Sequence, residues 1–480
     1  MVLPLFLIAG LLLGVNSIRV GNAETFLLNP NYQVEYFTEP IDHMNRDSGF
    51  INIKALIMNG SPSGPVFVYT GGNHPIEYEF QGAGFITEYL QLELNATVIF
   101  IEHRYYGDSV PSEEDYQYLT TSQALYDFAD ILDQVVPSNT TAVIAFGSVY
   151  SGMLAAFMRI KYPHIIDGAI ASSAPLLAQL DTQGTGFSRV VSYDYSMSNV
   201  NQLCHIWITD GFNILSNLIS RPTLYTALED TFHTCQSLND MGDIVQLQDW
   251  LTSIIKSIAL YNFPYVSNVY GPLPPWPVNV ACQLLQKYNM APVNQWSTLQ
   301  GMYEVANLYL NYTGRATCFD IYNVFEEGQP WMYQQCTELM MPMGQYGPIK
   351  TASNPLGGND MFPVRPWSTA QFIQMCQSVF GVTPKPSWIS VNYGMSANVN
   401  ETLQYASNIV FSYGQLDPFK YSCIQDEINP QTTVFYIRNA TTAVDLRTPS
   451  PNDPQTLMYA RNHEEILISQ WIAAKASSTA

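Results

Sequence analysis

The chain has 480 residues, of which 47% are hydrophobic and only 12% charged, a composition that excludes a disordered protein. Forty acidic residues against nineteen basic ones give a formal net charge of −21, which argues against binding to nucleic acid or to an anionic membrane surface. We expect no cofactor and no metal, because the sequence shows neither a glycine-rich phosphate loop after a strand nor metal-ligand spacing of histidines and cysteines.

The chain begins with an apolar run, MVLPLFLIAGLLLGVNS, followed by small residues. This pattern is typical of a secretory signal peptide, which we expect to span residues 1–23 with cleavage near Ser17 or Ala23. The alternative is a membrane anchor, but the run is short for a span and lacks a flanking basic cluster. We therefore expect a secreted protein at an extracellular or luminal surface, without a transmembrane anchor.

Two residue patterns agree with an oxidising compartment. Seven cysteines would allow six to pair and leave one over. Six N-x-Ser/Thr sequons predict N-glycosylation at Asn59, Asn95, Asn139, Asn311, Asn400 and Asn439.

Short β runs alternate with helical patterns over the first part of the mature chain, which we bound at 24–177. The predicted strands lie at 65–71, 97–104, 141–148 and 168–175, and helical spacing lies between them at 81–93, 121–136 and 150–162. Alternating strands and helices imply a parallel sheet covered on both faces.

The residue pattern changes between 178 and 400. Helical patterns dominate this segment, and it contains six of the seven cysteines. Strand patterns return over 401–480, at 408–414 and 432–439, before a final helix near 456–474. We therefore predict an α/β sheet domain that is interrupted by an inserted, disulfide-stapled helical domain.

The stretch AVIAFGSVYSGMLAAF at 142–157 has the pattern of a sharp strand-to-helix turn that presents a nucleophile. Residues two before and two after the tip must be small. Ser148 and Ser151 both have bulky neighbours at those offsets, whereas Val149 has Gly147 and Ser151. Val149 is therefore predicted at the tip, where it offers no attacking group. Because a β-branched residue suits strained backbone poorly, we expect the turn to have relaxed.

The acid and the histidine of a catalytic triad would follow later strands of such a sheet. Asp417 follows a predicted strand, where a histidine-orienting carboxylate belongs, although Asp before Pro is also an ordinary turn signal. The only histidine after it is His463, on a predicted surface helix. Without a nucleophile and a base, triad chemistry is expected to be absent.

Longer motifs carry a family resemblance over nearly the whole mature chain. They are EYFTEPIDHMN (35–45), IEHRYYGDSVP (101–111), GMLAAFMRIKYPHIIDGAIASSAP (152–175) and NIVFSYGQLDPF (408–419). With them the chain resembles the prolyl carboxypeptidase and dipeptidyl peptidase family of serine exopeptidases. The resemblance implies an α/β-hydrolase fold, a helical domain that caps the active site, and cleavage after proline or small residues near a peptide terminus.

The same resemblance assigns individual residues. It places the family's catalytic serine at Val149 and its histidine at Thr442, while Asp417 matches the aspartate. Apolar positions of the family's proline pocket fall on Met153, Met341 and Phe419, which ordinary core packing would explain equally well. The implied disulfides are Cys204–Cys282, Cys235–Cys318 and Cys336–Cys376. Cys423 is left over, either for an intermolecular bond or as a buried inert thiol.

These departures predict that the chain is not an enzyme but a catalytically degenerate member with a structural, self-assembling or binding role. The low charge, the sequons and the unpaired cysteine are compatible with the contortin-type branch, whose members form polymeric coats. We therefore expect self-association as a homodimer or polymer. Two alternatives stay open: an active exopeptidase that uses Ser148 through a shifted turn, and a decoy that binds peptides without cleaving them.

Overall fold

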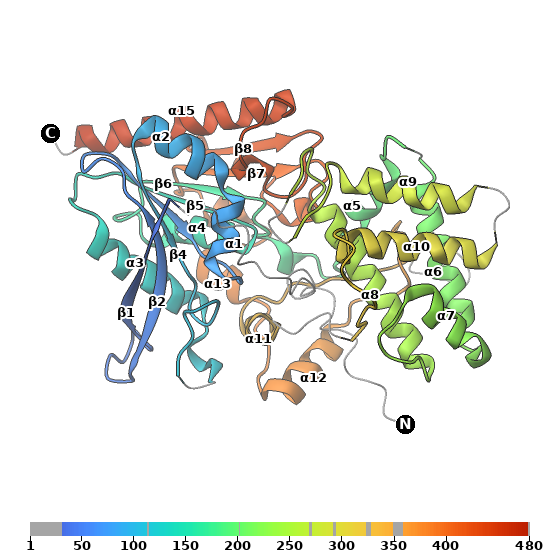
Figure 1. The fold of residues 1–480 in the computed structure, drawn as a ribbon. Helices are drawn as coiled ribbons and strands as arrows, with labels where there is room; N and C mark the ends of the chain where they lie inside the picture. The colour runs from blue at the N-terminus through green and yellow to red at the C-terminus, as the bar shows by residue number, and fades with distance from the viewer. Residues whose placement is uncertain are drawn as a thin grey trace.

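A computed structural model describes residues 31–112, 115–200, 202–267, 271–290, 294–322, 328–348 and 359–478 (Figure 1). The predicted signal peptide at 1–23 lies outside these residues.

The described chain is built around one eight-stranded sheet, with the order β1-β2-β4-β3-β5-β6-β7-β8. Six neighbouring strands run parallel: β4 (Thr97–Ile101), β3 (Val66–Thr70), β5 (Val143–Ser148), β6 (Gly168–Ser172), β7 (Ile409–Gly414) and β8 (Thr432–Ile437). The predicted parallel sheet is therefore confirmed for these six strands. The antiparallel strands β1 (Gln33–Pro40) and β2 (Phe50–Met58) extend the sheet beyond that prediction and make it mixed.

Helices cover both faces of the sheet, as strands buried on both sides require. Successive residues of β3 show the division: Val66 and Val68 point into one apolar cluster, whereas Phe67 and Tyr69 point into another. The first cluster contains residues of α3 (Thr121–Val135), α4 (Tyr150–Lys161) and α13 (Trp388–Tyr393). The second contains residues of α1 (Ile76–Gly82) and α15 (Gln455–Ser478). Short helices α2 (Gln91–Leu94) and α14 (Val399–Thr402) complete this part of the chain.

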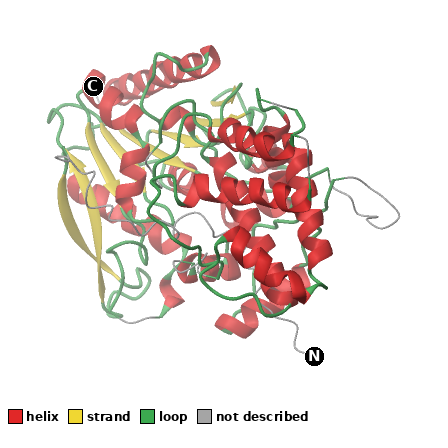
Figure 2. Cartoon of the chain, turned by 45° about the vertical axis from the view of Figure 1, so that its right-hand side comes forward, coloured by secondary structure: helices red, strands yellow, loops and turns green. Residues whose placement is uncertain are grey.

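A second body of helices lies beside the sheet, as Figures 1 and 2 show. It consists of α5 (Thr185–Ser196), α6 (Cys204–Leu218), α7 (Tyr225–Phe232), α8 (Met241–Leu260), α9 (Pro277–Asn289) and α10 (Gln295–Leu310). Helices α11 (Gln329–Thr337) and α12 (Thr369–Phe380) follow them in the chain and form a smaller apolar cluster. Helices α5 to α10 share an apolar core of their own. The predicted helical insertion is thus confirmed, while its bounds at 178 and 400 stay a prediction.

Three disulfides hold the insertion together. Cys204–Cys282 joins α6 to α9, Cys336–Cys376 joins α11 to α12, and Cys235–Cys318 links two loops. These are the pairs that the family resemblance implies. The seventh cysteine, Cys423, is buried and donates from its thiol to the carbonyl of Phe419, so a bond to another chain would require a local opening.

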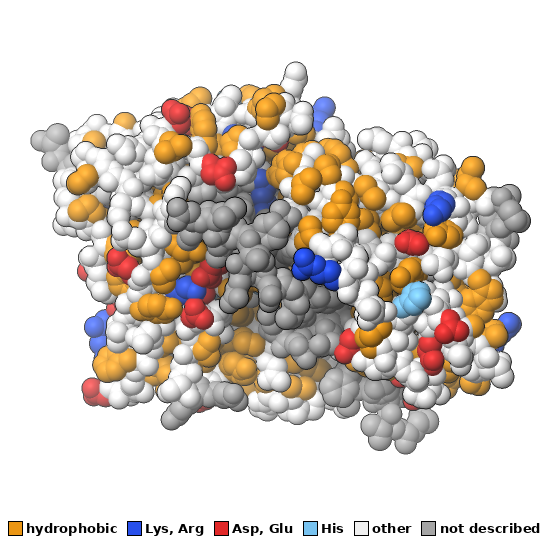
Figure 3. Space-filling model, in the orientation of Figure 1, with side chains coloured by type: hydrophobic (Ala, Val, Ile, Leu, Met, Phe, Trp, Pro, Cys, Tyr) orange, Lys and Arg blue, Asp and Glu red, His pale blue; other side chains and the backbone are white. Residues whose placement is uncertain are grey.

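The surface carries few charges for its size, and Figure 3 shows them scattered over mostly neutral side chains. The predicted glycosylation sites have different surroundings. Asn311 is half-buried, and its side-chain amide donates to the carbonyl of Ala316. The other five sequon asparagines, Asn59, Asn95, Asn139, Asn400 and Asn439, are exposed and open to a glycan. Glycosylation stays a prediction at all six.

A buried carboxyl group joins the insertion to the sheet domain. Glu338, which follows α11, is 5% exposed and accepts two hydrogen bonds of 2.7 Å, from the backbone N–H and the hydroxyl of Thr121 at the start of α3. Burial raises the pKa of Glu338 from 4.5 to about 7, against the hydrogen bonds from Thr121, which lower it. The folded protein therefore holds this proton more tightly than the unfolded chain does.

Because of this shift, Glu338→Gln should make the protein relatively more stable as the pH rises. The protonated Glu338 carboxyl stabilises the fold fully below about pH 4.5, and this contribution to the free energy of unfolding is lost as the pH rises to about 7. The difference in free energy of unfolding between variant and wild type should therefore move by about 1.4 kcal/mol per pH unit in the variant's favour over that window. Urea denaturation from pH 4.5 to 8 measures it, with the exposed Asp47→Asn as control; a difference that does not change with pH contradicts it.

Candidate active site

The turn between β5 and α4 has the geometry of a nucleophile elbow. Val149 stands at its tip with φ 52° and ψ −116°, so the expectation that the turn had relaxed is wrong. Close packing explains why it stays tight: a Cβ at Gly147 would lie 2.2 Å from the carbonyl oxygen of Ser151, and one at Gly152 2.9 Å from that of Ser172. Holding a β-branched residue in this conformation costs on the order of 1–3 kcal/mol.

Asp417 lies after β7, where a histidine-orienting carboxylate belongs. Its Oδ1 accepts from the hydroxyl of Thr442 at 3.0 Å and from the backbone N–H of Phe419 at 2.9 Å. Burial raises the pKa of Asp417 to about 6, although hydrogen bonds from Ser173, Phe419 and Thr442 lower it. The carboxyl and the position of the missing histidine are therefore in direct contact.

The end of β6 connects this pair to the elbow. The backbone N–H of Val149 donates to the carbonyl of Ser172 at 3.0 Å. The next residue, Ser173, accepts from the backbone N–H of Ala443 at 2.8 Å, which is the neighbour of Thr442. The structure thus gathers Val149, Asp417 and Thr442 at the carboxyl ends of adjacent strands, the edge where functional residues of parallel sheets meet.

A second carboxyl group beside the elbow was missed by the sequence analysis. The hydroxyl of Ser148 lies 2.9 Å from that of Tyr69, which donates to Oε2 of Glu79 at 2.8 Å. Ser151 donates to Oε1 of Glu79 at 3.0 Å. Burial raises the pKa of Glu79, against these hydrogen bonds, which lower it. No local pattern in the sequence marks Glu79, which reaches the elbow only through the packing of α1 on the sheet.

The expected proline pocket is only partly assembled. Met153 and Met341 belong to the same apolar cluster and are 1% and 6% exposed. Phe419 lies outside that cluster, half-buried against Phe187, with 5.1 Å between ring centroids. The two methionines therefore fit the ordinary core packing that was the alternative to a pocket.

Neither His463 nor His103 is hydrogen-bonded to Asp417 in the structure. His463 is on α15, as predicted, with its ring against that of Tyr459. His103 is fully buried beside the elbow, with Nε2 3.1 Å from the hydroxyl of Tyr150, and burial lowers its pKa to about 4. His103 therefore stays neutral near pH 7 and serves to position Tyr150.

One group in the described part of the chain could hold a metal ion, although the sequence predicted none. Ligand atoms of Glu39, His43 and Asp130 lie within 4.8 Å of one another. However, Nε2 of His43 is 2.8 Å from Asp127, and its Nδ1 is 3.6 Å from Asp130. Because a carboxylate oxygen lies near each ring nitrogen, the imidazole of His43 already has partners for both nitrogens within the protein.

A parallel sheet with an elbow after β5 and an acid after β7 defines the chain as an α/β-hydrolase. The family model described as serine carboxypeptidase S28 matches residues 50–464. The chain belongs to this family, as the resemblance had indicated.

Named relatives agree with the family. The chain is 32% identical to the lysosomal Pro-X carboxypeptidase of Bos taurus over 92% of its length and 88% of the relative's. It is 30% identical to prolyl carboxy peptidase like protein 5 of Caenorhabditis elegans over 93% and 91%. Among solved structures, proline iminopeptidase from Mycobacterium smegmatis is 11% identical, with 92% and 99% of the two chains covered and a TM-score of 0.34.

The prediction that the chain is not an enzyme is contradicted by these comparisons. Its relatives are named as carboxypeptidases and as putative serine proteases, and none of these names marks an inactive protein. The prediction rested on the residue types at Val149 and Thr442 alone. The hydrogen bonds from Tyr69 and Ser151 to Glu79, with Ser148 next to Tyr69, show that hydroxyl groups and a carboxyl group remain in contact beside the tip.

Proposed function

We propose that the chain acts on peptides in a luminal or secreted compartment, and that it binds and hydrolyses them at the elbow. The names of the relatives support the substrate class, since several are Pro-X carboxypeptidases. The three disulfides support the compartment, because such bonds persist where the surroundings are oxidising. None of the described helices combines the length and apolar character that crossing a bilayer requires. Self-association stays a prediction.

The hydrogen-bond chain from Ser148 through Tyr69 to Glu79 is the observation that supports hydrolysis. Ser148 is half-buried, whereas Ser151 and Ser173 are each 1% exposed, so Ser148 is the most accessible of these hydroxyls. As the Ser148 oxygen attacks the peptide carbonyl, its proton passes to the oxygen of Tyr69 while the proton of Tyr69 passes to Glu79. The reverse transfer protonates the departing amine as the C–N bond breaks, and water then releases the acyl group from Ser148. A raised pKa makes the ionised Glu79 carboxylate a more basic proton acceptor.

The backbone beside Ser148 can stabilise the charge that develops. The first N–H groups of an α-helix have no acceptor within the helix, and they favour negative charge. Helix α4 begins at Tyr150, two residues after Ser148. An attacked carbonyl at this turn would therefore meet unpaired N–H donors, as in an oxyanion hole.

The test combines turnover with covalent labelling. The full chain is incubated with a short peptide ending in Pro-X, and with a fluorophosphonate probe. We expect mass spectrometry to show loss of the residue after proline and a probe adduct on Ser148. Ser148→Ala should lose both, while the exposed Ser138→Ala keeps both. Absence of turnover and labelling in the wild type, or unchanged labelling in Ser148→Ala, overturns the proposal.

A further inference from the structure

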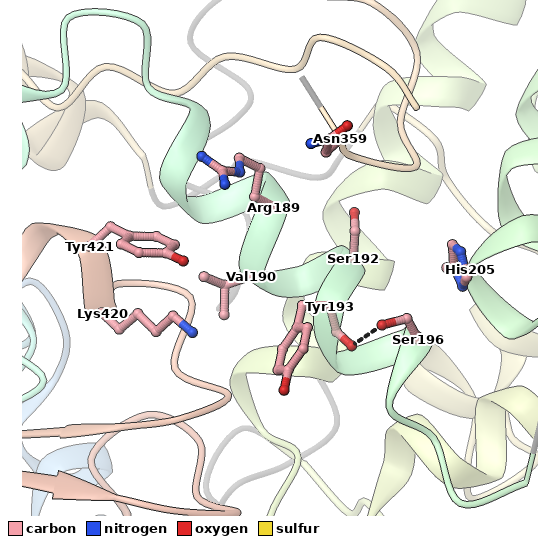
Figure 4. Close-up of a pocket in the computed structure, with 9 residues that line it drawn as sticks. All are labelled: Arg189, Val190, Ser192, Tyr193, Ser196, His205, Asn359, Lys420 and Tyr421. Atoms are coloured by element: carbon pink, nitrogen blue, oxygen red, sulfur yellow. Dashed lines mark hydrogen bonds between the residues drawn. The ribbon is translucent and has the colours of Figure 1, made fainter. Parts of the chain in front are cut away.

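A cavity of about 350 Å³ lies where the insertion meets the segment that follows Asp417. One wall is helix α5, with Arg189, Ser192 and Tyr193, and the facing wall carries Lys420 and Tyr421 (Figure 4). The volume is within the usual range for small-ligand sites, about 300–1,000 Å³. No part of the mechanism proposed above uses these residues.

The cavity concentrates positive charge in a strongly acidic protein. Arg189 and Lys420 both line it, and no carboxylate from the described residues does. Among the described residues, no carboxylate shares the cavity lining with Arg189, and its guanidinium lies 5.7 Å from the ring centroid of Tyr421. Two basic side chains that face one cavity, with no carboxylate of the described residues in its lining, favour an anionic ligand.

Lys420 is held in place by a neutral acceptor and two aromatic rings. Its Nζ donates to the backbone carbonyl of Gln415 at 3.0 Å and lies 5.4 and 5.1 Å from the ring centroids of Tyr193 and Tyr421. Burial lowers the pKa of Lys420; Asp417 opposes this shift and the charge of Arg189 adds to it. A bound anion would relieve both the burial cost and the repulsion between the two cations.

The cavity adjoins the candidate active site. The backbone N–H of Lys420 donates to the carbonyl of Asp417 at 3.0 Å. On the other wall, the hydroxyl of Tyr193 accepts from the side chain of Gln415 at 3.2 Å, within the loop that leads to Asp417. The wall that carries Lys420 is therefore continuous with the loop that carries Asp417.

We propose that this cavity binds a carboxylate of a peptide ligand through Arg189 and Lys420, with the rings of Tyr193 and Tyr421 packed against the residue that carries it. The carboxylate is either the C-terminus of the peptide or an Asp or Glu side chain. The proposal takes its ligand class from the proposed function, but it does not require hydrolysis.

Calorimetry with two peptide pairs tests the proposal and separates the two sources of the carboxylate. The first pair is a proline-containing peptide with a free C-terminus and its C-terminal amide; the second is an amidated peptide with Glu and its Gln counterpart. We expect the carboxylate member of one pair to bind at least about tenfold more tightly, because hydrogen bonds to charged groups are the stronger ones. A difference in the first pair assigns the C-terminus, and one in the second assigns the side chain.

Variants then locate the site. Arg189→Gln and Lys420→Met should each reduce the preference for the carboxylate, while the exposed Arg315→Gln keeps it. Unchanged unfolding midpoints show that the variants fold. If neither pair differs, or if both cavity variants keep the preference, the proposal is overturned. Ser148→Ala should retain the preference for the carboxylate peptide. If hydrolysis is absent while this preference is present, only the proposed function of the elbow is contradicted, and the proposed carboxylate site is not.

Discussion

A double variant with Val149→Ser and Thr442→His is expected to hydrolyse a Pro-X peptide at least about 100-fold faster than the wild-type chain, because a positioned general base contributes about 10²–10⁴-fold. The backbone for this change is already present. Val149 keeps the φ and ψ of an elbow, and Thr442 is 3.0 Å from the Asp417 oxygen that would orient the imidazole. Serine also lacks the β-branching that strains position 149.

Single variants show whether the two positions act together. Val149→Ser alone has a hydroxyl without a base, and Thr442→His alone has a base without a hydroxyl, so each should gain much less than the pair. Fluorophosphonate labelling should move to residue 149 only in the double variant. A double variant that keeps the wild-type unfolding midpoint yet shows neither effect would mean that the scaffold does not align these positions.

Asp127→Ala is expected to lower the free energy of unfolding by about 3–5 kcal/mol, since it leaves a buried guanidinium without its partner. Arg104 is 0% exposed and donates to both oxygens of Asp127 at 2.6 Å. The same guanidinium donates to the carbonyls of Pro40 and Ile41 at the end of β1. The variant therefore leaves the buried charge of Arg104 without a carboxylate partner. It also weakens the attachment of β1 to α3.

Asp130→Ala is the matched control on the same helix. Its carboxylate is 34% exposed and pairs with Arg46 at 3.1 Å, so its loss should cost no more than about 1 kcal/mol. Guanidinium chloride denaturation of the two variants makes the comparison. A similar loss of stability in both would contradict the assignment of Arg104–Asp127 as a key buried pair.

The central sheet could be predicted because its strands are continuously apolar, while the first two strands could not. Strand β1 is exposed over most of its length, so no buried run marks it. Strand β2 is buried, but Lys54 interrupts its apolar pattern. That lysine is tolerated because its Nζ donates to Asp108 at 2.7 Å and also pairs with Glu77. A partner that comes from elsewhere in the fold cannot be read from the strand itself.

The same contrast holds at the site. The tip of the elbow follows from local sterics, because Gly147 and Ser151 are neighbours of Val149 in the sequence. The contact between Tyr69 and Ser148 joins residues 79 positions apart, and that between Glu79 and Ser151 joins residues 72 apart. Glu79 therefore belongs to the site only once α1 has packed on the sheet, and predicting from residue types at aligned positions led to the wrong conclusion about activity.

The place of the insertion within the sheet also has a consequence for synthesis. Strand β6 pairs with β7, which follows the whole insertion in the chain. At about 5–20 residues per second, the segment between the two strands takes roughly 10–50 s to emerge. All three disulfides lie within that segment, so they can close while β6 still presents an open edge. The nascent chain must therefore protect a hydrophobic strand edge during this interval, and the arrival of β7 and β8 is the step that ends its exposure to aggregation.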